Sequence, residues 1–174
     1  MASKKHLILI PVTLIVSLIV GTNSGLRINK EGLELLTKYE QCTSNQYVDL
    51  RGIPTQGCGD TNFVTKKNKT KEQVAKDLVN NLQEFENCIN TYFDGASMND
   101  NQFSAMVVLT YNIGCTNAKG KSKPTNLRTL ALNHNYKDMC HRIRAFNMAG
   151  GNIIKGLDNR RKEEEVLCLK PVKG

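Results

Sequence analysis

Two acidic residues, Glu40 and Asp49, stand nine positions apart in a segment that also holds the hydroxyl of Thr55 and three glycines. Two carboxyl groups held apart with a water between them can break a glycosidic bond when one is protonated and the other is ionised. Acids at such a spacing are also common on protein surfaces, where they are simply solvated. The pair alone therefore does not select this chemistry, and the residues around it have to be considered.

Those residues resemble the active-site segment of the T4-type phage lysozymes, a family of muramidases. The resemblance rests on Glu40, Tyr47-Val-Asp49, Gly52 and Thr55-Gln-Gly57-Cys-Gly59. Further matches follow in the family's order over roughly residues 29 to 168: Gln102 with Tyr111-Asn-Ile-Gly114, Thr125-Asn-Leu127, Leu132-Asn-His-Asn-Tyr136, and Ala149-Gly-Gly151 leading into Gly156-Leu-Asp-Asn-Arg160-Arg161-Lys-Glu-Glu164. Each piece is common by itself, but their shared order is hard to explain otherwise.

The resemblance implies an endolysin-type lysozyme that hydrolyses the glycosidic bond between N-acetylmuramic acid and N-acetylglucosamine in peptidoglycan, with no metal and no cofactor. It implies that Glu40 protonates the leaving oxygen, that Asp49 polarises the attacking water or steadies the transition state, and that Thr55 positions this water. Such a reaction inverts the anomeric centre, with carboxyl groups roughly 6.5 to 9.5 Å apart. Tyr111 and Asn126 match the family's substrate contacts, although a core aromatic and a helix-capping Asn would explain them almost as well.

Two departures from the family pattern keep a non-enzymatic alternative open. The usual Gly-x-Gly-His becomes Gly57-Cys-Gly-Asp60, which adds a third acid that could raise the pKa of a nearby carboxyl group or be solvated. The family also tends to carry Trp near Phe146, and this sequence has none. The alternative is a wall-binding module that keeps the lysozyme fold but has lost turnover.

Two further enzyme classes fit the sequence poorly. A zinc amidase would need two or three suitable ligands, and outside the first 25 residues only His134 and His141 are histidines. A cysteine peptidase built on Cys42 or Cys58 with His134 is less favoured, because six thiols in an exported chain are better explained as disulfides.

The 174 residues predict a single compact domain after the leader, with a net charge of +8, of which Lys4 and Lys5 supply two. Such a surface collects near polyanions. Nucleic acid is not expected as a partner, because the chain lacks finger spacings and Trp. The basic cluster Lys66-Lys-Asn-Lys-Thr-Lys71 is interpreted as a solvated loop.

Residues 1–25 have the layout of an export signal: two lysines, an apolar run from Leu7 to Val20, and a small polar string. Both a cleaved signal and a releasable membrane anchor fit, since no charge occurs from His6 to Leu26 and about 20 residues can span a bilayer. A buried helix is disfavoured because the run has no polar face. We therefore expect export to the periplasm or cell envelope, with transient membrane contact.

The remaining residues, 26–174, are expected to form a monomeric lysozyme-like catalytic domain. All six cysteines lie in this part, and disulfides are the natural inference, although the sequence does not choose their pairing. Arg160 and Arg161 are expected to make surface or interlobe ion pairs with Glu163 to Glu165, without a catalytic part.

The coarse secondary structure is mainly α with a small N-terminal β-sheet, an α+β fold of two lobes joined by a long helix. A helix over about 30–40 would end at Glu40, where the helix dipole disfavours a negative charge. Asp49 and Thr55 would then flank the turn of a hairpin. A capping box at Thr70 to Gln73 opens a helix of about 20 residues, and Asn99 caps a buried helix that ends at Gly114. Shorter helices are expected at about 125–133, 136–147 and 157–168.

Overall fold

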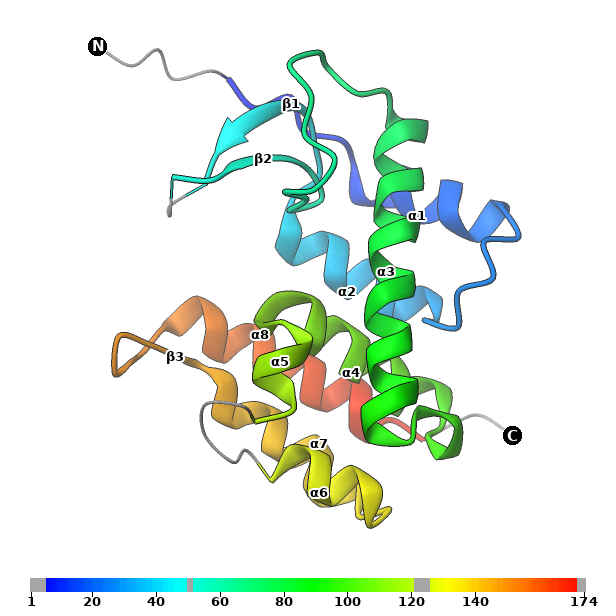
Figure 1. Ribbon diagram of the computed structural model, residues 1–174, viewed down its shortest axis with the longest axis vertical. Helices are drawn as coiled ribbons and strands as arrows, with labels where there is room; N and C mark the ends of the chain where they lie inside the picture. The colour runs from blue at the N-terminus through cyan, green and yellow to red at the C-terminus, as the bar shows by residue number, and fades with distance from the viewer. Residues whose placement is uncertain (1–5, 50–51, 121–125, 172–174) are drawn as a thin grey trace. The chain divides into compact units, whose positions relative to one another are not determined.

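The structure is a computed structural model that describes residues 6–49, 52–120 and 126–171. These residues divide into two compact units. Unit 1 contains the chain up to Gly25 together with Leu36–Asn81, and unit 2 contains Leu26–Leu35 together with the chain from Leu82 onwards. Two helices, α2 (Lys30–Glu40) and α3 (Lys71–Phe93), belong partly to each unit (Figure 1). The predicted mainly helical class and the long connecting helix are confirmed, the latter with 23 residues.

Unit 1 is built around a short antiparallel hairpin. Strand β1 (Thr43–Val48) pairs with β2 (Pro54–Gly57), and Tyr47 lies opposite Thr55 in the register. The capping box that opens α3 is present, since Thr70 and Gln73 each accept a backbone N–H from the other. The apolar side chains at helical spacing in α3, such as Val74 and Leu78, are buried as the pattern predicts.

The leader is folded into unit 1 and does not stand apart from it. Residues 8–10 run antiparallel to β1, with Ile10 N–H donating to the Cys42 carbonyl and Ser44 N–H to the Ile8 carbonyl. The ten-residue helix α1 (Val12–Gly21) follows and lies beside α3 (Figure 1). It buries three side chains: Ile15, Val16 and Ile19. The run, for which a buried helix was disfavoured, thus packs one side of a short helix against unit 1, while the other side stays exposed, with Val20 56% exposed.

Unit 2 is a helical bundle around α4 (Asp100–Ile113). The helix begins with the predicted capping box of Asn99 and Gln102, ends at Gly114 with φ +82°, and is buried from Phe103 to Thr110. It packs on α8 (Lys155–Leu169). The other elements are η1 (Gly95–Ser97), α5 (Cys115–Ala118), α6 (Leu127–Leu132), α7 (Tyr136–Arg142), η2 (Ile143–Phe146), and a hairpin of β3 (Met148–Ala149) and β4 (Asn152–Ile153).

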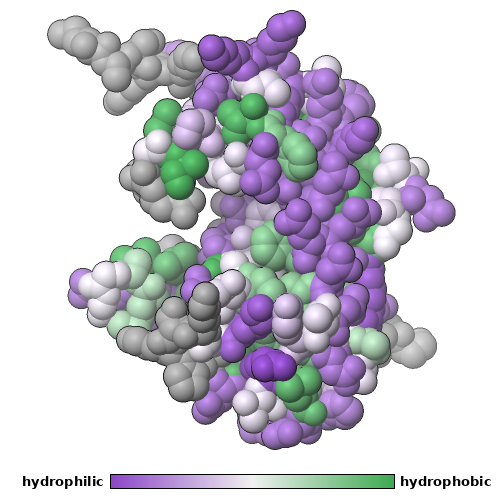
Figure 2. Space-filling model, in the orientation of Figure 1, coloured by the Kyte–Doolittle hydropathy of each residue, from purple (hydrophilic) through white to green (hydrophobic). Residues whose placement is uncertain are grey.

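The sequence did not predict the β3–β4 hairpin, which turns through Gly150 and Gly151 at φ +57° and +83°. Its strands carry exposed apolar side chains, with Met148 54% and Ile153 67% exposed. The hairpin is seen on the left of Figure 1, and Figure 2 shows apolar surface at the same place. The predicted helix at 136–147 is divided here into α7 and the 3₁₀ turn η2.

The two arginines of α8 correct another expectation. Arg161 is fully buried and Arg160 is 4% exposed, and both form ion pairs with the buried Glu164 of the same helix. Arg161 also donates to the Phe146 carbonyl and to the Asn112 side chain. These partners all lie in unit 2. The prediction of surface or interlobe pairs is therefore wrong, since residues spaced i, i+3 and i+4 on one helix satisfy each other internally.

All six cysteines form disulfides, as the sequence predicted. The pairs are Cys42–Cys58 in unit 1, and Cys88–Cys115 and Cys140–Cys168 in unit 2. The described residues include no helix with the length and apolar character needed to cross a membrane.

Candidate active site

Glu40 is the last residue of α2, as predicted, and its side chain is half-buried. The helix stops there because Gln41 adopts a left-handed backbone conformation, φ +49°, while its N–H still donates to the Thr37 carbonyl. A residue in this conformation is a common way to end a helix, although glycine usually occupies the position. The chain then turns directly into Cys42 and β1, which places the Glu40 carboxyl group at the hairpin.

Gly59 lies against the Glu40 carboxyl group. A Cβ atom on Gly59 would stand 2.8 Å from Glu40 Oε2, and the backbone of Gly59 has φ +75°. The buried disulfide between Cys42, two residues after Glu40, and Cys58, the residue before Gly59, joins the two segments close to this contact. The absence of a side chain at Gly59 therefore leaves room for the Glu40 carboxyl group.

Replacing Gly59 by Ala should therefore lower hydrolytic activity by about tenfold or more, because the methyl group would displace the Glu40 carboxyl group. The left-handed backbone should also cost about 1 kcal/mol or more in the free energy of unfolding. The control is Gly25→Ala, since Gly25 has φ +70° but no atom within 4 Å of its Cβ position. Equal activity losses in the two variants would show that backbone strain, not the contact with Glu40, is responsible.

Asp49 and Thr55 meet at the turn of the hairpin through one shared carbonyl. The Asp49 N–H donates to the Ile53 carbonyl at 2.9 Å, and the Thr55 hydroxyl donates to the same oxygen at 3.1 Å. Asp49 Oδ1 in turn accepts the Ile53 N–H at 2.9 Å. Thr55 is 3% exposed, so its hydroxyl is fixed in place. The prediction that these two residues flank the turn is confirmed; residues 50 and 51 lie outside the described range.

Tyr47 is a residue of the site that the sequence reasoning did not single out. Burial, followed by the negative charges of Glu40 and Asp49, raises the pKa of its phenol. The negative charges of Glu40 and Asp49 therefore both act on the phenol of Tyr47, which lies opposite Thr55 in the hairpin register. Its position two residues before Asp49, the same face of a strand, was the available signal.

Asp60 is neither solvated nor free, in contrast to one of the two readings of the sequence. It is 4% exposed, and its carboxylate accepts the N–H groups of Asn62 and Phe63. Lys69 Nζ lies 3.7 Å from Asp60 Oδ2 and 2.7 Å from Asp77 Oδ2. Lys69 is itself only 6% exposed, so the basic cluster is not entirely a solvated loop as predicted. The third acid thus shares a buried lysine with Asp77, which lies closer to the ammonium group.

The predicted substrate contacts lie in unit 2. Tyr111 sits on α4 with its ring centroid 5.1 Å from that of Phe85. Asn126 precedes α6 with φ +56°, and its side chain makes no capping hydrogen bond to the described helix. Helix capping therefore does not account for this asparagine.

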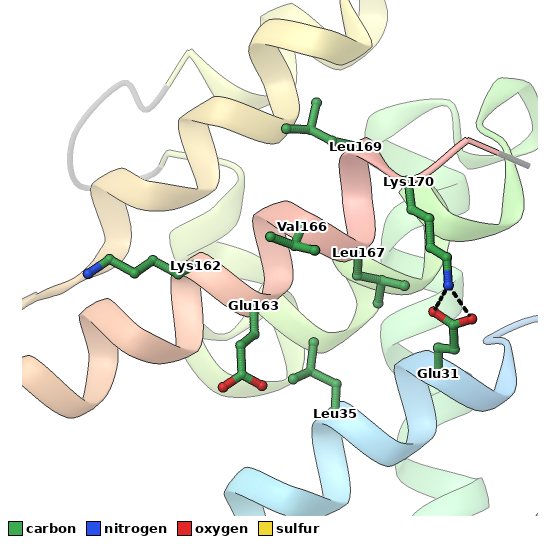
Figure 3. Close-up of a pocket in the computed structure, with 8 residues that line it drawn as sticks. All are labelled: Glu31, Leu35, Lys162, Glu163, Val166, Leu167, Leu169 and Lys170. Atoms are coloured by element: carbon green, nitrogen blue, oxygen red, sulfur yellow. Dashed lines mark hydrogen bonds and ion pairs between the residues drawn. The ribbon is translucent and has the colours of Figure 1, made fainter.

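Other candidate groups lie elsewhere and are occupied. His134 Nε2 lies 3.0 Å from Asp94 Oδ2, and His141 Nδ1 lies 2.7 Å from Glu165 Oε1, so the two histidines are hydrogen-bonded to different carboxyl groups. A groove of about 710 Å³ in unit 2 is lined by residues of α2 and α8 and bordered by the Lys170–Glu31 ion pair (Figure 3). None of the predicted site residues lines it.

Comparison with known proteins agrees with this arrangement. The family model "Phage lysozyme" matches residues 37–164. The SAR-endolysin of Haemophilus phage HP1 is 41% identical over 151 residues, which cover 82% of this chain and 81% of the relative. The SAR-endolysin of Escherichia phage P1 is 34% identical over 166 residues, which cover 91% and 89% of the two chains. None of these matches favours a module without turnover.

Two solved structures of P1 phage endolysin Lyz are similar to this chain. The active form matches with a TM-score of 0.86 and 32% identity, over 93% of this chain and 95% of the other. The secreted inactive form matches with a TM-score of 0.57 and 29% identity, over 82% and 95%. The matched family model and these relatives show that the chain belongs to the phage lysozyme family and is an endolysin of the muramidase class.

Proposed function

We propose that unit 1 carries the catalytic centre of this endolysin, with Glu40 as general acid, Asp49 as the partner that polarises water, and Thr55 as a positioning residue. The observations that carry the proposal are the contact between Gly59 and the Glu40 carboxyl group, and the hydrogen bonds that fix Asp49 and Thr55 at the turn of the adjoining hairpin. One acid at a helix end and a second in a hydrogen-bonded turn are two different environments, as an acid and a base require.

In the proposed reaction, Glu40 donates its proton to the glycosidic oxygen as the bond to the anomeric carbon breaks. Asp49 accepts a proton from the attacking water, which adds to the opposite face of the sugar and inverts the anomeric centre. The Thr55 hydroxyl stabilises the turn by donating to the Ile53 carbonyl, and its oxygen can still accept a hydrogen bond from a water. Tyr47 is protonated at neutral pH, as an ordinary phenol already is, and the raised pKa only moves its titration further from neutrality, so its O–H is available as a hydrogen-bond donor. Tyr111 and Asn126 would contact the glycan from unit 2.

The test is analysis of the reducing ends of muropeptides released from purified peptidoglycan, followed by proton NMR of the first-formed anomer. We expect new muramic acid reducing ends with the α configuration. Anhydro products would indicate a transglycosylase, and initial β products would indicate a retaining mechanism; either result contradicts the proposed role of Asp49.

We infer that the leader is a signal-anchor that stays attached and joins the catalytic unit after it leaves the membrane. Its edge strand and the buried face of α1 support this, because a cleaved leader could not supply them. The higher similarity to the active form of the P1 endolysin than to its secreted inactive form is consistent with the same interpretation. The chain would then be exported to the periplasm with its N-terminus intact.

Asn45→Ala should weaken this docking. The buried Asn45 amide accepts the Ile8 N–H at 2.7 Å and donates to the His6 carbonyl at 3.0 Å, so it clamps the leader to β1. Loss of the clamp should cost about 1–3 kcal/mol and shift protein from the soluble to the membrane fraction. Fractionation and thermal unfolding measure both effects, with the exposed Asn80→Ala as control. A mature protein that begins near Gly25, found by N-terminal sequencing, would exclude the retained leader.

A further inference from the structure

A polar cavity of about 370 Å³ lies in unit 2, between the second half of α3 and α5, and the proposed catalytic residues do not line it. One wall is a stripe of exposed polar side chains on α3: Glu84, Asn87 and Thr91. These positions follow each other at i, i+3 and i+7, so they share one helix face. The lining also includes the ring of Tyr92, at the end of α3, and the ammonium group of Lys119, which lies over this ring.

The cavity is held in shape by fixed contacts. The Cys88–Cys115 disulfide joins its two helices and lines it. Phe85 lines the cavity and also packs against Tyr111, one of the proposed substrate contacts. The Arg128 side chain donates to the Tyr92 carbonyl at 3.0 Å and holds the end of α3. A cavity of this size and rigidity is at the lower end of the range of ligand sites.

The chemistry of the lining suits an N-acetylated sugar with a carboxylate-bearing substituent next to it. The CH face of a pyranose ring packs on an aromatic face, and its hydroxyl and N-acetyl groups pair with amide, hydroxyl and carboxylate side chains. Tyr92 is 36% exposed, and Lys119 Nζ lies 3.7 Å from its ring centroid. At such a partly exposed site the cation–π contact is weak. Lys119 can therefore leave the ring and pair with a carboxylate, which opens the aromatic face.

We propose that this cavity, the α3–α5 groove, is a second glycan-binding site that holds N-acetylated peptidoglycan strands through the Tyr92 ring and a stem-peptide carboxylate paired with Lys119. The proposal rests on the muramidase function and adds a contact outside the catalytic residues. Because the substrate is a polymer, a second contact on the same material raises the effective concentration of cleavable bonds. A short oligosaccharide that fills one site alone gains nothing from it.

The experiment measures binding in the absence of turnover. Tyr92→Ala and Lys119→Gln are each placed in the Glu40→Gln protein, and co-sedimentation with purified peptidoglycan sacculi is titrated. We expect each variant to bind about five- to tenfold more weakly. Phe63→Ala and Lys137→Gln serve as matched controls, since Phe63 is a 43% exposed aromatic of unit 1 and Lys137 an exposed lysine on another helix. Both controls should bind like their parent.

A second comparison separates binding from folding. Tyr92→Phe keeps the ring and should retain binding within about twofold of the parent; a loss in Tyr92→Phe equal to that in Tyr92→Ala would contradict stacking. In the active protein, Tyr92→Ala should raise KM for sacculi while the rate on short soluble oligosaccharides of alternating N-acetylglucosamine and N-acetylmuramic acid is retained. Unchanged binding in both Tyr92→Ala and Lys119→Gln overturns the proposal. If the protein with Glu40 intact binds sacculi more tightly than its Tyr92→Ala variant but releases no reducing ends, the groove proposal holds and the proposed catalytic function fails.

Discussion

Replacing Glu40 by Gln should lower kcat for peptidoglycan hydrolysis by about 10²–10⁴-fold, the contribution typical of general acid–base catalysis. Gln keeps the size of the side chain and its contact with Gly59, but it cannot donate an acidic proton to the glycosidic oxygen. Since Glu40 is half-buried at a helix end, the thermal midpoint of unfolding should change little. Release of reducing ends from purified sacculi measures the rate.

The matched control is Glu34→Gln on the same helix. Glu34 is exposed and forms an i, i+4 pair with Lys30 at 3.7 Å, an interaction worth about 0.3–0.5 kcal/mol. This variant should lyse cells like the parent. If Glu40→Gln also retains parental activity, Glu40 is not the acid, and the roles given to Gly59 and Tyr47 lose their basis.

Glu164→Gln should destabilise the protein by about 3–5 kcal/mol, the largest stability effect we expect of a single charge removal. Burial raises the pKa of Glu164, while the guanidinium groups of Arg161 and Arg160 oppose that rise. In the folded protein both arginines and the carboxylate are excluded from solvent. Removal of the negative charge therefore leaves two buried cations without compensation.

Urea denaturation measures this loss, which is a large part of the 5–15 kcal/mol or so that stabilises a typical domain. Glu163→Gln is the natural comparison, because Glu163 is the preceding residue of α8 and is only half-buried; it should stay within about 0.5 kcal/mol of the parent. A difference of less than about 1 kcal/mol between Glu164→Gln and its neighbour would mean that the cluster is hydrated in solution.

The sequence predicted the parts of the fold that depend on local periodicity. Helices α2, α3 and α4 begin and end close to the expected residues, because caps at Thr70 and Asn99 and the glycine at 114 act within one turn. The hairpin that carries Asp49 and Thr55 was equally local. The assignment of Glu40 and Asp49 as the two acids came from the resemblance in order alone, without knowledge of distances, and stays a prediction.

The features that the sequence could not predict depend on which residues become buried and on left-handed turns of the backbone. An apolar run such as Leu7 to Val20 suits a membrane and a protein core alike, so its packing in unit 1 was not foreseen. Buried arginines are rare, so Arg160 and Arg161 were placed on the surface. The contact of Gly59 with Glu40 depends on the left-handed turn at Gln41, a conformation that Gln rarely adopts.

The edge strand at residues 8–10 has a consequence for any recombinant version of this enzyme. A shortened polypeptide that started at Leu26 would leave the Cys42 carbonyl and the Ser44 N–H, at the start of β1, without their main-chain partners. It would also expose the surface of unit 1 against which Ile15, Val16 and Ile19 pack. An unpaired sheet edge of this kind favours strand pairing between molecules. The shortened product should therefore form inclusion bodies or soluble aggregates even though every proposed catalytic side chain is still encoded.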